Sequence, residues 1–279
     1  MFASIRRSIC SKHHSPKIEL KRSLQRCFSA LAKPPSGEPQ RQPSARPNSA
    51  QIFRKLLPYT SKYDGERYFV PQTWTDKVVK GMVKLFRFPM DTIFREDYMR
   101  RVIYLETVAA VPGLVAGSWL HFHCLRRLHD DAGWIIRLLD ESENERMHLT
   151  AFLHYEQPGL LQRFMILATQ IVYTSVYFVA YAVSPKACHR FVGMLEEEAV
   201  FSYNEFLKLV DSGKIPNGPA PKVAKDYWEL STDATLRDLI VAIRDDECEH
   251  RDINHAYASE IQDGTSPYDF EPISPTSRS

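Results

Sequence analysis

The amino-acid sequence predicts an all-α protein. Apolar residues recur at helical spacing in long segments from Thr73 onward, and no strand-length alternating pattern of consequence occurs. The motif Glu-x-x-His occurs twice, in "NERMHL" and in "DDECEH", each time in a helical segment with apolar neighbours. Helical residues three apart share a face, so each motif directs a carboxylate and an imidazole the same way.

Length and composition indicate a folded protein. The 279 residues can form one large domain or two small ones, and the hydrophobic content of 44% and charged content of 25% are typical of a globular chain. A net charge of +2, without a zinc-finger or RNA-binding motif, argues against a nucleic-acid partner. The five cysteines are scattered without a CxxC pair, so we expect neither a disulfide framework nor a cysteine zinc site, and a reducing compartment.

The N-terminal part differs in composition from the rest. Residues 1–33 contain eight lysines or arginines, several serines and the single acid Glu19, which is typical of a mitochondrial transit peptide, although a basic disordered tail has the same composition. Residues 34–72 begin rich in proline and serine and are expected to form a linker or N-terminal arm. Residues 73–262 are predicted to form the helical domain, and residues 263–279 a polar tail.

The first two helical segments follow the arm. "TDKVVKGMVKLFRF" has lysines between apolar residues, with Thr73 or Thr75 as its N-cap, and fits either a packing helix or one lying on an anionic membrane surface. "RVIYLETVAAVPGLVAGSWLHF" contains Glu106 as its only charge after Arg101. Pro112 and Gly113 are expected to bend or interrupt it.

The later segments are also helical. "GWIIRLLDESENERMHLTAFLHYE" is expected to end near Pro158. Residues 164–184 form an uncharged run that could span a bilayer, lie in one leaflet or be buried in the protein. "RFVGMLEEEAVFSYNEFLKLV" and "TLRDLIVAIRDDECEHRDINHAYASEI" complete the set, separated by a loop rich in proline and glycine from Gly213 to Pro221.

Two single glutamates stand in apolar surroundings. Glu106 has apolar neighbours in every direction along a helix, and Glu196 aligns with Val192, Val200 and Tyr203, whereas the next two glutamates of "LEEEA" rotate away. Unpaired buried carboxylates are costly, so such residues are normally protonated, paired or bound to metal.

In chain order the sequence gives a glutamate followed by Glu-x-x-His, twice. This is the ligand set of a carboxylate-bridged di-iron bundle, in which two helices supply a glutamate each and two supply Glu-x-x-His. The four carboxylates would offset two Fe(II) ions, and the oxygen and imidazole donors suit iron or manganese. Taken alone, either motif also fits an exposed helix face. The predicted metal ligands are Glu106, Glu145, His148, Glu196, Glu247 and His250.

Four blocks of sequence resemble one family. "RVIYLETVAAVPGLVAG", "NERMHL", "HRFVGMLEEEA" and "DECEHRDINH" are similar to motifs of the mitochondrial alternative oxidases, and the resemblance covers about residues 90–262. It implies a ferritin-like four-helix bundle with two iron ions on the six ligands. Asn144, Asp246 and Trp228 would orient those ligands, and Tyr203 would be the catalytic residue that supplies an electron or proton during O–O cleavage.

The resemblance also implies a substrate and a location. Members oxidise ubiquinol and reduce dioxygen to water without pumping protons, on the matrix-side leaflet of the inner mitochondrial membrane. The segments "RVIYLETVAAVPGLV" and "FMILATQIVYTSV" would form part of the monotopic membrane surface. His189 matches a family histidine, and a homodimer without thiol control is expected, because no counterpart of the plant regulatory cysteine lies between residues 34 and 90. The implied quinol-pocket residues are Arg101, Leu105, Leu195, Glu198 and Ser202, the last replacing a threonine usual in many members.

Two other functions fit the same residues. A plastid-type terminal oxidase or a quinone hydroxylase would use a similar di-iron site with a quinone. A ferritin-like iron-binding protein or membrane scaffold would hold metal without oxidising quinol.

Overall fold

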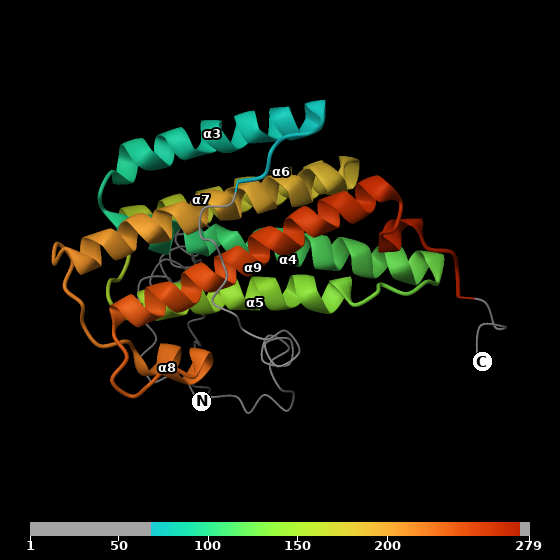
Figure 1. Ribbon diagram of the computed structural model, residues 1–279. Coiled ribbons are helices and arrows are strands. Elements are labelled where there is room, and N and C mark those ends of the chain that lie inside the picture. The colour runs from blue at the N-terminus through green and yellow to red at the C-terminus, as the bar shows by residue number, and fades with distance from the viewer. Residues whose placement is uncertain (1–67, 274–279) are drawn as a thin grey trace, which may run out of the picture. The chain divides into compact units, whose positions relative to one another are not determined.

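The computed structural model describes residues 68–273, and these are helical apart from short connections (Figure 1). The only strand-like pairing in this part of the chain is a single bridge between Pro219 and Thr235. The all-α prediction is therefore confirmed. The described residues belong to one compact unit, Ser44–Ser279. The predicted transit peptide and nearly all of the predicted linker lie outside the described residues.

Four long helices form the bundle, namely α4 (Tyr98–Arg127), α5 (Trp134–Phe152), α7 (Pro185–Asp211) and α9 (Leu236–Asp263). Helix α4 packs along α5, and α7 packs along α9 (Figure 1). Two apolar clusters fill the interior, one around Phe206 and Ile240 and the other around Leu120 and Tyr181. Five of the six predicted ligand positions fall between these clusters along their helices, and His148 lies at the edge of the first cluster. Glu106, for example, lies between Ile103 of the first and Val111 of the second.

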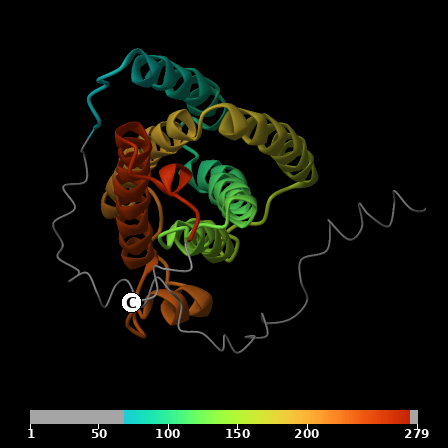
Figure 2. The ribbon, with the colours of Figure 1, turned by 90° about the vertical axis from the view of Figure 1, so that its right-hand side faces the viewer.

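Helices α3 (Trp74–Phe94) and α6 (Leu160–Val183) lie on the side of the bundle away from α5 (Figure 2). Thr73 caps α3: its side chain accepts a hydrogen bond from the Asp76 backbone, and the Asp76 carboxylate accepts one from the Thr73 N–H. This reciprocal capping confirms one of the two predicted start points.

Both α4 and α6 are long and apolar enough to cross a membrane, but they differ in burial. Half of the apolar window of α4 is buried inside the protein, against 11% for α6. Of the residues of α6, only Tyr177 and Tyr181 are buried, and side chains such as Ile171, Val176 and Val179 are exposed. Helix α4 is therefore a core helix, whereas α6 presents an apolar face to its surroundings.

Helix α4 is continuous through Pro112, so of the two expected effects, a bend or an interruption, the interruption does not occur. The adjacent glycine has a packing role, because a Cβ on Gly113 would lie 2.4 Å from the Leu138 carbonyl oxygen of α5. Helix α5 ends at Phe152 rather than near Pro158. There the backbone tightens, with the N–H groups of His154 and Tyr155 donating to carbonyls three residues back.

Two short helical elements were absent from the sequence-based prediction. Helix α8 (Lys222–Trp228) packs on α5 directly after the predicted loop, and a 3₁₀ turn, η1 (Pro267–Asp269), lies in the polar tail. The tail returns to the bundle, since the Ile273 N–H donates to the Leu128 carbonyl at 2.9 Å.

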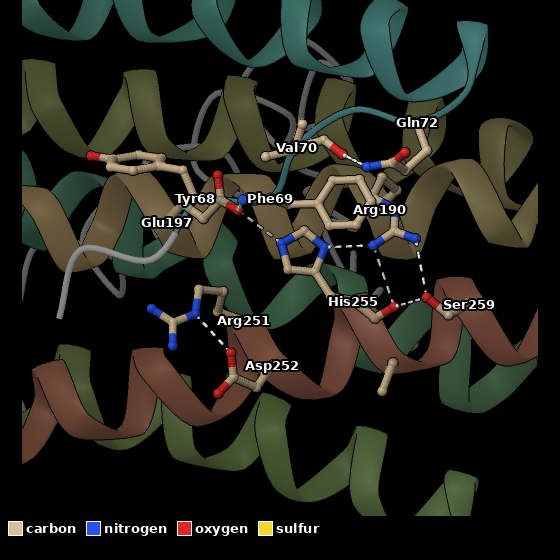
Figure 3. Close-up of a pocket in the computed structure, with 11 residues that line it drawn as sticks. Tyr68, Phe69, Val70, Gln72, Arg190, Glu197, Arg251, Asp252, His255 and Ser259 are labelled. Carbon is tan, nitrogen blue, oxygen red and sulfur yellow. Dashed lines mark hydrogen bonds and ion pairs between the residues drawn. The ribbon is translucent and has the colours of Figure 1, made fainter. Parts of the chain in front are cut away.

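Residues 68–72 dock on α7 and α9 through Phe69 (Figure 3). The Phe69 ring lies 3.8 Å from the Arg190 guanidinium and stacks on His255 with centroids 4.9 Å apart. Its backbone N–H donates to the buried Glu197 carboxylate at 2.5 Å, and His255 lies 3.0 Å from the same oxygen. A cavity of about 650 Å³ lies beside this contact. The second glutamate of "LEEEA" thus anchors the arm.

Candidate metal centre

Three bundle helices bring four predicted ligands to one buried point. Glu106 comes from α4, Glu145 and His148 from α5, and Glu247 from α9. One potential ligand atom of each lies within 4.8 Å of those of the other three. All four side chains are buried, and His148 is 0% exposed. This proximity is what a shared cation requires.

His148 directs one ring nitrogen at three carboxylates. Its Nδ1 lies 3.4 Å from Glu106 Oε2 and 3.3 Å from Glu145 Oε2. Glu247 Oε1 is also 3.3 Å from the same nitrogen. An imidazole nitrogen faced by three acids is at the position of a metal ligand.

His250, the histidine of the second Glu-x-x-His motif, faces two of the same carboxylates. His250 Nδ1 lies 2.8 Å from Glu145 Oε1 and 3.5 Å from Glu247 Oε2. Glu145 and Glu247 therefore each place one oxygen near His148 and the other near His250. That is the arrangement of two carboxylates shared between two neighbouring cations.

Glu196 comes from α7 and lies on the Glu247 side of the cluster. Its side chain is half-buried. Burial, followed by the negative charges of Glu247 and Glu145, raises the pKa of Glu196 well above its usual range. The structure thus brings together the carboxylates and imidazoles of all four predicted helices.

The acids perturb one another strongly. Burial, and then the charge of Glu145, raises the pKa of Glu106 to about 8. Burial opposes ionisation of Glu145 as well, but the charges and hydrogen bonds of the two histidines outweigh it and lower the pKa of this carboxyl. Burial opposes protonation of His148, but the negative charges of Glu145 and Glu106 outweigh it and raise the pKa of this imidazole well above its usual range. Such mutual perturbation is typical of functional sites.

The donor atoms fit a metal. Five buried atoms of this cluster have no hydrogen-bond partner although they face one another, which is unusual because buried polar atoms are normally satisfied. They are Oε2 of Glu106, Glu145 and Glu247 and Nδ1 of His148 and His250. Carboxylate oxygen and imidazole nitrogen together suit iron or manganese, and four carboxylates offset two divalent ions.

Polar side chains around the cluster hold it in place. Asp246 Oδ2 accepts hydrogen bonds from Asn144 Nδ2 at 2.9 Å and from the Trp228 indole at 2.7 Å, and lies 3.4 Å from His148 Nε2. The Tyr203 hydroxyl, buried on α7, donates to Glu106 Oε1. Of the residues that resemblance assigned to orientation and to catalysis, Asp246 and Tyr203 thus contact cluster residues directly, and Asn144 and Trp228 hold Asp246.

Three of the five predicted quinol-pocket residues lie in one polar network between α3, α4 and α7. Arg101 Nη1 bonds to Asp91 at 2.6 Å, and Arg87 pairs with both Asp91 and Glu198. The Ser202 hydroxyl donates to the Glu198 carbonyl at 2.8 Å. Leu105 and Leu195 are half-buried, and none of the five lines the cavity beside the arm.

Sequence reasoning missed several residues of these networks. Arg87 and Asp91 link the predicted Glu198 and Arg101. Arg87 was interpreted as part of an amphipathic helix, and Asp91 lies just beyond that segment. Glu141 is buried one turn before Glu145 on the same face of α5, and burial raises its pKa to about 7. Glu141 lies four residues before the predicted ligand Glu145, and this spacing could have indicated that it shares the same helix face.

The fold and cluster define the class of four-helix-bundle proteins that carry carboxylate-rich metal sites. Residues 63–259 match the family model described as alternative oxidase. Several curated proteins are similar. Ubiquinol oxidase 1c, mitochondrial, of Arabidopsis thaliana is 50% identical over 198 residues, which cover 71% of this chain and 60% of that protein.

Two further relatives match over a similar length. Ubiquinol oxidase, mitochondrial, of Batrachochytrium dendrobatidis is 50% identical over 192 residues, 69% of this chain and 61% of that protein. Ubiquinol oxidase 1a, mitochondrial, of Oryza sativa subsp. japonica is 48% identical over 211 residues, 75% of this chain and 63% of that protein. The chain belongs to the alternative oxidase family, and it spans about three-fifths of the length of these relatives.

Proposed function

We propose that this chain is a ubiquinol oxidase that passes electrons from ubiquinol to dioxygen, forming water, at two iron ions. The observation that carries the proposal is the sharing of Glu145 and Glu247 between His148 and His250. The names of its relatives support ubiquinol as the substrate. Glu106 and Glu196 would complete the two halves of the site.

When bound, the iron ions would supply the redox chemistry that activates dioxygen. The protein supplies their environment. Its four carboxylates keep a dication pair near neutrality, which matters because uncompensated charge is costly in a buried site. Asp246, held by Asn144 and Trp228, fixes the ring of His148. The Tyr203 hydroxyl donates its proton to Glu106 Oε1 and would supply that proton when dioxygen is reduced.

Quinol would bind at the polar network between α3, α4 and α7. Arg101 and Glu198 offer a donor and an acceptor for the two ring oxygens of a quinol, and Nε of the buried Arg101 has no partner. Leu105, Leu195 and the Ser202 position would complete the pocket. The nearby apolar faces of α3 and α6 would let an apolar quinol enter from the membrane.

The proposed function also implies where in the cell the protein acts. The exposed apolar faces of α3 and α6 would bind one leaflet, on the matrix side of the inner mitochondrial membrane, with residues 1–33 as the targeting segment and residues 73–262 as the oxidase domain. The names of the relatives support the mitochondrion. The homodimer expected from family resemblance stays a prediction, which native mass spectrometry tests.

Oxygen uptake by membranes containing the protein tests the activity. With ubiquinol and cyanide present, wild-type membranes should consume oxygen and Glu196→Ala membranes should not. Continued uptake by the variant would refute the assignment.

Isotope analysis separates this function from its rivals. With ¹⁸O₂, an oxidase places all the label in water, whereas a quinone hydroxylase leaves label in the quinone ring. An iron-binding protein without oxidase activity would show no quinol-dependent uptake at all.

A further inference from the structure

A carboxylate partner for the second ring nitrogen is evident for His148 but not for His250. His148 directs Nδ1 at the ligand carboxylates and Nε2 at Asp246, 3.4 Å away. A metal-ligating histidine almost always gives its second ring nitrogen a carboxylate, a carbonyl or a water, which fixes the ring and raises its basicity. His250 likewise directs Nδ1 at Glu145 and Glu247, so its Nε2 needs an equivalent partner.

Glu141 is a buried acid near His250, with no direct hydrogen bond to the His250 ring. It lies on the same face of α5 as Glu145, one turn earlier, and is 7% exposed. After burial, the charge of His250 is the strongest influence on the pKa of Glu141 and opposes the effect of burial. The proposed function gives this carboxylate no role.

A single amide ties Glu141 to the helix of His250. Asn254 Nδ2 donates to the two carboxylate oxygens of Glu141 at 2.9 and 3.1 Å, and to the His250 carbonyl at 3.0 Å. Asn254 is 1% exposed. In the other half of the site, the amide of Asn144 donates to Asp246 in the same manner. Each motif histidine thus has a buried acid nearby, and each acid has a buried asparagine.

The orientation of Asn254 is itself fixed. Because its NH₂ group is used by Glu141 and the His250 carbonyl, its oxygen must accept, so the Nδ1–H of His189 donates to it at 2.9 Å. The Nε2 of His189 then accepts from the Tyr181 hydroxyl at 2.9 Å, and Tyr181 accepts from Tyr268 at 2.9 Å. Every donor in this chain points toward Glu141, an arrangement that favours a carboxylate at its end.

We propose that Glu141 is the positioning carboxylate of His250, the counterpart of Asp246 for His148, and that Asn254 holds it in place. The inference deepens the proposed function and concerns metal binding. It assigns His189 and Tyr181 to the support of this half of the site. If Glu141 had a purely structural role, its replacement would instead lower the melting temperature of the iron-free protein and leave the iron affinity unchanged.

Iron binding by the full-length protein tests the proposal. We expect Glu141→Gln to bind Fe(II) about 10 to 100 times more weakly than wild type, the usual effect of losing such a partner. Asp246→Asn should show a loss of similar size. Glu143→Gln is the matched control, because Glu143 lies on the same helix but is exposed and paired with Arg146.

The melting temperature of the iron-free protein separates positioning from structure. We expect iron-free Glu141→Gln to melt no lower than wild type, while the gain in stability on adding iron shrinks with the affinity. Unchanged iron affinity, whatever the melting temperature, would overturn the proposal.

Asn254→Ala provides a second variant that keeps the acid. It should weaken iron binding less than Glu141→Gln does, and an unaltered affinity would argue against the role of Asn254. Absence of quinol oxidation in the wild type would refute the proposed function but leave these binding results meaningful.

Discussion

At the scale of single residues, two glutamates connect the two halves of the cluster. Because Glu145 and Glu247 each face both histidines, we expect removal of either to affect both halves of the site, whereas Glu106 lies beside His148. Outside this set, buried hydrogen-bonding side chains such as Asn144 and Tyr203 decide where the ligands point.

Tyr203 can be tested apart from metal binding. Tyr203→Phe keeps the ring that stacks on Phe152 but removes the hydroxyl that donates to Glu106. We expect two iron ions per chain, as in wild type, and quinol-dependent oxygen uptake lower by about 100-fold or more, the range of a lost proton donor. Tyr155→Phe, whose hydroxyl bonds to the distant Pro219 carbonyl, is the control and should be fully active. An active Tyr203→Phe protein would exclude the catalytic role.

His189 should make stability depend on pH. Burial lowers its pKa to about 4, so the folded protein keeps this ring neutral while the unfolded chain takes up a proton below its ordinary value of 6.5. Stability therefore falls as pH drops from 6.5 toward 4. Between pH 7 and pH 5, wild type should lose about 2 kcal/mol more than His189→Gln in urea unfolding. Equal losses by the two proteins would show that His189 does not titrate in this way.

At the scale of elements, close helix packing positions the ligands. On α4, Gly113 lies two turns after Glu106, and a Cβ there would meet the backbone of α5. We expect Gly113→Ala to destabilise the protein by about 1–3 kcal/mol, because backbone cannot give way as a side chain can. Gly81→Ala on α3 is the control. It meets nothing within 4 Å and should stabilise by up to about 1 kcal/mol through helix propensity. Similar effects of the two substitutions, measured by thermal unfolding, would contradict this account of the packing.

The sequence predicted the long helices and the ligand cluster because both leave local periodic signals. Glu-x-x-His shares a helix face by geometry, and Glu106 stood out as a lone charge in an apolar run. Burial by a distant segment leaves no such signal. Glu197 is contacted by Phe69 of the arm and by His255 of α9, and Asn254 of α9 bonds to Glu141 of α5, so both depend on segments far away in the chain. Helix α8 follows a loop rich in proline and glycine, and its 7 residues are too few to show a helical periodicity in the sequence.

At the scale of the whole molecule, the side formed by α3 and α6 differs from the rest. Both helices lie on the side of the bundle away from α5 (Figure 2). Both expose large apolar side chains, including Phe88 on α3 and Val179 on α6. Val83 and a few others face inward, so the outer faces are not needed for the core. Such a surface is suited to insertion into one leaflet.

Charge placed on this face should release the protein from membranes. We expect the double variant Ile171→Glu, Val179→Glu to fold and bind iron but to stay soluble in a vesicle flotation assay, since burying charge in the leaflet is costly. Ile136→Glu alters an equally exposed residue of α5 and should leave flotation unchanged. Equal flotation of all three proteins would place the membrane contact elsewhere.

Oxygen uptake by the purified protein with ubiquinol and cyanide, before and after removal of iron, tests the central claim most directly. We predict that uptake disappears with the iron and returns in full when two ions per chain are restored. Uptake that persists in the iron-free protein, or its absence from the fully loaded one, would contradict a di-iron ubiquinol oxidase.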